Sequence, residues 1–208
     1  MLVLISDLFH WLQKNPNLII EGLGVITALI YLYFSIRQKI WLWPFGILTS
    51  AFYIFVFFNS RLYADMGLQA YYLLISFYGW YFWLTGGKKQ NAKRLKVSFL
   101  SRKLGLTLLL ITFIIYWLLV WVLNVLPTLL EILPSDLLYW DAFTTAASIV
   151  ATWMLTRKII EQWLIWIVVD LVSMGLYIYK GLYLTSGLFL VYALLAIYGY
   201  YEWKKEMR

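Results

Sequence analysis

One apolar segment near the C-terminus carries the residues best suited to hold a ligand. Over 162–179, five of them form a stripe: Trp163, Trp166, Asp170, Ser173 and Tyr177. Their spacing places them on a single face of a helix. Tryptophan faces attract cations as well as flat rings, and a carboxylate adds a full negative charge. The stripe is therefore suited to a small, flat, cationic aromatic molecule.

Asp170 stands near the middle of this apolar segment, where ordinary packing does not explain a carboxylate. On insertion scales an acidic side chain at the centre of a membrane span costs roughly 2.5–3.5 kcal/mol. We therefore expect Asp170 to face a cavity or a partner. A structural hydrogen bond to a serine or tyrosine is the alternative. Trp163 has an alternative too, since tryptophan is common as an anchor at the membrane interface.

Two other apolar segments carry polar stripes at helical spacing. The segment around 66–84 contains Asp65, Gln69, Tyr72 and Ser76, and the segment 138–156 contains Asp141, Thr144, Thr145, Ser148 and Thr152. The simplest arrangement turns all three stripes toward one aqueous pathway. Gln69 and Tyr72 could equally hold helices together, as polar residues do in bilayers.

The composition shows which elements must position these residues. The chain has 208 residues, of which 63% are hydrophobic and 13% charged, whereas a soluble domain is about half apolar and a quarter charged. It contains no Cys and a single His, so disulfides, thiolate zinc sites and His-rich metal or haem sites are excluded. We expect an integral membrane protein without a cofactor, and with no soluble catalytic or nucleic-acid-binding domain.

The apolar stretches predict an all-α fold with seven transmembrane helices. They lie at about 18–36, 40–58, 66–84, 104–126, 138–156, 162–179 and 183–202. The predicted organisation is an N-terminal interfacial amphipathic segment (1–17), a first three-helix repeat (18–84), a basic cytoplasmic loop (85–103), a linking helix (104–126), an outer loop (127–137), a second three-helix repeat (138–203) and a cytoplasmic tail (204–208).

Basic residues favour one orientation of these spans. With the N-terminus outside, only Lys14, Arg61 and Lys180 lie outside, and the other fourteen of the 17 Lys and Arg residues lie inside. Because basic residues concentrate in cytoplasmic loops, this bias predicts an outer N-terminus and a cytoplasmic C-terminus. The basic run 88–103 is then a solvated loop rather than a nucleic-acid site.

The chain also repeats itself. A shift of 120 residues aligns 37–83 with 157–203 without a gap, and fourteen positions are identical, including Arg37/Arg157 and Trp43/Trp163. Three helices plus one linking helix separate the copies, so both copies enter the membrane in the same orientation. Parallel repeats of this kind are found in transporters, with the substrate site between the repeats near the midplane.

At these residues the chain resembles the PnuC family of bacterial vitamin transporters. The resemblance covers about 18–204 and is carried by "NSRLYADMGLQAYYLLISFYGWYFW" (59–83) and "RKIIEQWLIWIVVDLVSMGLYIYKGLYLTSGLF" (157–189). It implies a 3+1+3 helix arrangement and a homotrimer in the bacterial inner membrane. It also implies passage of nicotinamide riboside down its gradient, with a cytoplasmic kinase trapping the product.

The resemblance implies a role for several site residues. Trp163 and Trp166 would flank the pyridinium ring, while Asp170, Gln69 and Tyr72 would hydrogen-bond the amide or the ribose. The predicted site comprises these residues with Ser173, Tyr177 and Asp65. Other members carry thiamine or riboflavin. Thiamine is also a flat cation, so the stripe does not separate it from nicotinamide riboside.

Two other function classes remain as alternatives. In an ion-coupled transporter a proton would be carried by an acidic residue of the spans: Glu21, Asp65, Asp141 or Asp170. A membrane-embedded enzyme is disfavoured, because the sequence shows no nucleophile–base pair, and it has no P-loop for ATP. We therefore predict a facilitator and not an enzyme.

Overall fold

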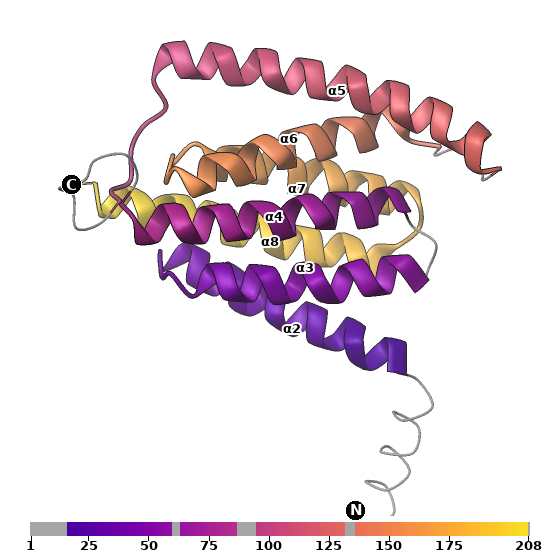
Figure 1. Cartoon of the computed structure of the whole chain (residues 1–208), viewed down its shortest axis with the longest axis horizontal. Coiled ribbons are helices and arrows are strands. Elements are labelled where there is room, and N and C mark those ends of the chain that lie inside the picture. The colour runs from indigo at the N-terminus through magenta and orange to yellow at the C-terminus, as the bar shows by residue number, and fades with distance from the viewer. Residues whose placement is uncertain (1–15, 60–62, 87–94, 132–135, 208) are drawn as a thin grey trace, which may run out of the picture. The chain divides into compact units, whose positions relative to one another are not determined.

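The computed structural model describes residues 16–59, 63–86, 95–131 and 136–207, and their regular structure is helical except for one isolated bridge between Ser98 and Ile159. The described residues form seven helices, which Figure 1 shows: α2 (Pro16–Ile36), α3 (Leu42–Asn59), α4 (Tyr63–Leu84), α5 (Arg102–Leu130), α6 (Leu138–Thr156), α7 (Gln162–Tyr179) and α8 (Tyr183–Lys205). The all-α prediction is confirmed. The amphipathic segment predicted over 1–17 lies almost wholly outside the described residues.

The helices have lengths suited to a bilayer. The shortest, α3 and α7, have 18 residues, or about 27 Å, close to the thickness of the hydrocarbon core. Within the described part of the chain, α2, α3, α5 and α7 are long and apolar enough to cross a membrane by length and composition alone. The remaining helices, α4, α6 and α8, have a more polar composition.

The chain divides into two compact units, Met1–Leu84 and Thr85–Arg208. In the first unit, α3 packs against both α2 and α4. In the second, α5 packs on α6, α6 on α7, and α7 on α8. The grouping of the helices into two three-helix repeats around a linking helix stays a prediction.

The segment before α5 is tied to the turn between α6 and α7. The backbone N–H of Ser98 donates to the carbonyl of Lys158 (3.0 Å), and the N–H of Ile160 donates to the carbonyl of Ser98 (3.1 Å). The N–H of Leu100 donates to the Glu161 carboxylate (3.0 Å). These bonds fix where α5 begins in the second unit.

Both units contain the same tryptophan pair at the base of a helix hairpin. Trp43 of α3 meets Trp83 of α4 edge-to-face, with centroids 5.4 Å apart. In the second unit Trp163 of α7 meets Trp203 of α8 in the same geometry at 5.6 Å. All four positions obey the offset of 120 residues. The repeat found in the sequence is therefore present in the local structure of each unit.

A glycine makes each pair possible. A Cβ built on Gly199 would lie only 2.7 Å from Cη2 of Trp163, and a Cβ on Gly79 would collide with the ring of Trp43 in the same way. Any larger residue would collide with a buried indole ring. The turns that lead into α3 and α7 correspond too, because Gln38 and Lys158 both adopt a left-handed backbone, with φ of 51° and 52°.

Candidate functional site

The predicted ligand stripe runs along α7. Asp170 and Ser173 are buried, with 6% and 8% of their surface exposed, whereas Trp166 and Tyr177 are half-buried. From Trp163 to Tyr177 the stripe spans fourteen residues, about 21 Å of helix. It therefore extends over most of α7, with two tryptophans at its N-terminal end, Asp170 and Ser173 in the middle and Tyr177 at its C-terminal end.

Trp163 is the most enclosed member of the stripe. It is 2% exposed and packs on Trp203 and Gly199. Its indole Nε1 is buried and finds no hydrogen-bond partner in the described part of the chain. Trp43 has the same surroundings in the first unit, so the environment of Trp163 is that of a packing residue. Stacking of Trp163 on a ligand stays a prediction.

Trp166 and Asp170 form the part of the stripe best placed to act on a ligand. They lie four residues apart on α7, so their Cβ atoms are about 5–6 Å from each other. The structure joins the Asp170 carboxylate to no other described residue by a hydrogen bond or ion pair. A buried carboxylate without a structural partner beside a partly exposed indole can receive a cationic ring.

The C-terminal end of the stripe is aromatic. Tyr177 stacks on Phe189 of α8, with centroids 5.1 Å apart and planes 26° apart. Phe189 in turn meets Tyr192 edge-on at 5.8 Å. These rings join α7 to α8 and fix the orientation of the Tyr177 side chain.

The other predicted residues lie on α4 in the first unit. Asp65 is exposed in the first turn of α4, while Gln69 and Tyr72 are half-buried one and two turns later. The Ser76 hydroxyl donates to the carbonyl of Tyr72 at 2.7 Å. The structure therefore gathers Asp65, Gln69 and Tyr72 on one helix. The α7 and α4 stripes belong to different compact units of the chain.

The polar stripe of α6 is largely satisfied within its own helix. The hydroxyls of Thr144, Thr152 and Thr156 donate to backbone carbonyls one turn earlier, at 2.7–3.2 Å. Ser148 and Thr152 are buried. Since these threonine protons are engaged by the backbone, α6 offers a ligand fewer donors than its sequence indicates.

One polar residue beside the stripe was missed by the sequence reasoning. Gln162, the first residue of α7, is 1% exposed, and its Nε2 finds no hydrogen-bond partner among the described residues. The signal was available, because an amide directly before an apolar segment needs a partner when buried. Leu42 stands at the corresponding place in the first unit.

Comparison with known proteins relates the whole arrangement to transporters. The model of the nicotinamide mononucleotide transporter family matches residues 18–205. The nicotinamide riboside transporter PnuC of Escherichia coli (strain K12) is 27% identical over 176 residues, covering 76% of this chain and 73% of that protein. The riboflavin/roseoflavin transporter RibM of Streptomyces davaonensis is 27% identical over 188 residues, covering 80% of this chain and 79% of the relative.

The fold is found in a solved structure as well. The crystal structure of the vitamin B3 transporter PnuC matches with a TM-score of 0.67 and 23% identity, over 98% of this chain and 88% of that one. The family match, the shared fold and the apolar helices agree with one another. The chain is therefore a multi-pass membrane protein that belongs to the nicotinamide mononucleotide transporter family, the family of the PnuC proteins.

Proposed function

We propose that this protein is a vitamin transporter that carries nicotinamide riboside across the bacterial inner membrane. The observation that carries the proposal is the pair formed by Trp166 and Asp170 on α7. Nicotinamide riboside contains a flat pyridinium ring with a fixed positive charge. An indole face binds such a ring by stacking and by cation–π attraction, and the buried carboxylate balances its charge.

Other residues of the two stripes complete the proposed site. Ser173 and Tyr177 extend it along α7. The family resemblance implies that Gln69 and Tyr72 of α4 supply hydrogen bonds to the amide or the ribose, and Asp65 of the same helix is part of the proposed site. Trp163 supports Trp166 from the adjacent turn and closes the inner end. The identity with nicotinamide riboside transporters supports this substrate class.

The proposed transport mode is facilitated diffusion. Phosphorylation by a cytoplasmic kinase would trap the substrate and keep uptake running down a gradient. The charge bias of the loops supports an outer N-terminus and a cytoplasmic C-terminus. We expect the functional unit to be a homotrimer, as the family resemblance implies.

A binding titration tests the substrate. Purified protein in detergent is titrated with nicotinamide riboside, thiamine and riboflavin in parallel, and quenching of tryptophan fluorescence is followed. We expect saturable binding of nicotinamide riboside. Saturable binding of thiamine or riboflavin alone would overturn this substrate, and binding of none would overturn the vitamin assignment.

The same assay tests the site. Trp166→Ala should abolish saturable binding, because the ring that stacks on the pyridinium is lost. Trp121→Ala is the matched control, since this side chain is 63% exposed on α5 and belongs to neither stripe. Equal loss of binding in the two variants would disprove the assignment of Trp166.

Thiamine is the second candidate, because it too is a flat cation that the Trp166–Asp170 pair could hold. Riboflavin is neutral and fits the carboxylate less well, although the Streptomyces relative is a riboflavin transporter. Proton coupling through an acidic residue such as Asp170 is the alternative mode. Exchange of substrate across liposomes without an ion gradient supports the facilitator, whereas a strict need for a proton gradient contradicts it.

A further inference from the structure

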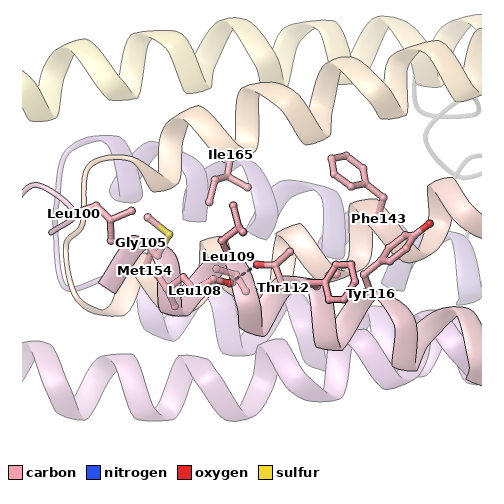
Figure 2. A pocket seen from close by; sticks show the side chains of 12 residues that line it. Leu100, Gly105, Leu108, Leu109, Thr112, Tyr116, Phe143, Met154 and Ile165 are labelled. Atoms are coloured by element: carbon pink, nitrogen blue, oxygen red, sulfur yellow. Dashed lines mark hydrogen bonds between the residues drawn. The ribbon is translucent and has the colours of Figure 1, made fainter. Parts of the chain in front are cut away.

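The second unit contains a groove that the proposed transport site does not use. It lies between α5, α6 and α7 and has a volume of about 440 Å³. Figure 2 shows Leu100, Gly105 and Met154 at one end of the groove and Phe143 and Tyr116 at the other. The lining is almost wholly apolar, so the groove is shaped for hydrocarbon rather than for a vitamin.

The groove follows one face of α5. Its α5 residues run from Gly105 to Tyr116 at helical spacing, a length of about 16 Å. One leaflet of a bilayer has a hydrocarbon depth of about 15 Å. The groove is thus as long as the apolar part of one leaflet. Because it follows α5, it runs in the direction in which a lipid chain extends.

The groove opens toward the surroundings and offers little to a polar ligand. Leu109 and Phe113 line it and are 71% and 59% exposed. The hydroxyl of Thr112, in the middle of the α5 face, donates to the carbonyl of Leu108 at 2.8 Å. Since this hydroxyl proton is already engaged, the middle of the groove presents methyl and ring carbons.

Positive charge lies beside the Leu100 end of the groove. Arg102 and Lys103 are exposed in the first turn of α5, directly between Leu100 and Gly105 in the chain. The nearby Glu161 carboxylate accepts the backbone N–H of Leu100. None of the residues that line the groove is basic, so these two cations lie beside its Leu100 end rather than inside it. One apolar groove with cations at one mouth matches the chemistry of a lipid with an anionic headgroup.

We propose that the groove between α5, α6 and α7 holds one acyl chain of an anionic phospholipid, with the headgroup phosphate against Arg102 and Lys103. The lipid belongs to the leaflet at the basic end of α5. It fills space that would otherwise be empty between α5 and the α6–α7 pair. It thereby stabilises the position of α5 on the second unit.

Native mass spectrometry of the detergent-purified full chain tests the proposal. Palmitoyl-oleoyl phosphatidylglycerol and palmitoyl-oleoyl phosphatidylcholine are added at equal concentration, because they share acyl chains and differ in headgroup charge. We expect adducts of the phosphatidylglycerol to exceed those of the phosphatidylcholine by about fivefold or more, because basic side chains attract anionic lipid.

Two variants separate the contribution of the acyl chain to binding from that of the headgroup. Thr112→Phe places a ring in the middle of the groove and should remove adducts of both lipids. Arg102→Gln combined with Lys103→Gln should leave adducts but abolish the preference for phosphatidylglycerol. Leu110→Phe, exposed on α5 and outside the groove lining, and Lys180→Gln, at the opposite end of α7, are the matched controls. Size-exclusion profiles and melting temperatures confirm that each variant folds.

Each contrary outcome overturns the proposal. Equal adducts of the two lipids in the unmodified protein would contradict the anionic headgroup. Unchanged adducts in folded Thr112→Phe would contradict the groove as the site. A change of oligomeric state in Thr112→Phe without loss of lipid would show that a second copy of the chain covers this face instead.

Discussion

The two units share a scaffold and differ where a ligand could bind. In each, a tryptophan on one helix packs edge-on against a tryptophan on the next, over a glycine that leaves room for the ring. The helices α3 and α7 begin and end at positions 120 residues apart. On this common frame the second unit carries Asp170, whereas the first carries Ser50, and both side chains are buried.

At neighbouring positions the two units place a large aromatic ring on different helices. In the first unit Gly46 lies against the ring of Tyr31 from α2, and a Cβ there would be 3.1 Å from that ring. In the second unit the corresponding residues are Trp166 and the fully buried Ala151. The large ring thus stands on α7 instead of on the preceding helix. The packing of the tryptophan pairs is the same in the two units, whereas Trp166 and Asp170 on α7 replace a glycine and a serine of α3.

Among substitutions that make one unit resemble the other, replacement of the α7 carboxylate should have the largest effect. We expect Asp170→Ser to weaken binding of nicotinamide riboside by about 1.5–3 kcal/mol, tenfold or more in Kd, because a charge-assisted contact is lost. Tryptophan quenching measures the Kd. Ser50→Ala in the first unit is the control and should leave Kd unchanged. An equal loss in both variants would show that the units share the binding role.

Replacing the glycine under the tryptophan pair with alanine should destabilise either unit, whether or not a ligand is bound. Gly199→Ala and Gly79→Ala each force a methyl group into a buried indole ring, which costs about 1–3 kcal/mol of stability. A lower melting temperature in detergent without ligand measures this loss. Because the same contact exists in both units, we expect losses of similar size.

A second pair of repeat-related glycines supplies the control. A Cβ built on Gly67 or Gly187 would have no atom within 4 Å, so alanine there should stabilise the helix by about 0.5–1 kcal/mol. If Gly67→Ala or Gly187→Ala lowered the melting temperature as much as Gly199→Ala, the tryptophan contact would not be the cause.

Much of this frame was predictable from the sequence. Apolar length indicated the seven helices, with α6 and α7 matching their predicted bounds of 138–156 and 162–179. Other ends shifted by a few residues. The largest shift is at the C-terminal end of α5, which runs to Leu130 through Pro127 rather than ending at 126. Helical continuation past proline depends on local packing, so the sequence pattern does not define it.

The site was predictable in type more than in detail. Helical spacing placed the α7 stripe on one face, but spacing does not reveal that Trp163 is enclosed by Trp203 and Gly199, which lie far along the chain. The same pattern turned Thr144 and Thr152 toward a shared aqueous pathway, whereas their hydroxyls donate to carbonyls of their own helix. Such contacts depend on side-chain rotamers and tertiary packing, which residue types alone do not determine.

Two serines sharpen the comparison at the level of a single hydroxyl. The Ser76 hydroxyl of α4 donates to the carbonyl of Tyr72, so its proton is engaged within the helix. Ser173 of α7 is buried beside Asp170 on the proposed ligand stripe. We expect Ser173→Ala to weaken nicotinamide riboside binding by about 0.5–1.5 kcal/mol, the net value of one hydrogen bond. Ser76→Ala should leave Kd unchanged. A loss confined to Ser76→Ala would place the hydroxyl that the substrate needs in the first unit, and the polar groups of α7 would then serve packing.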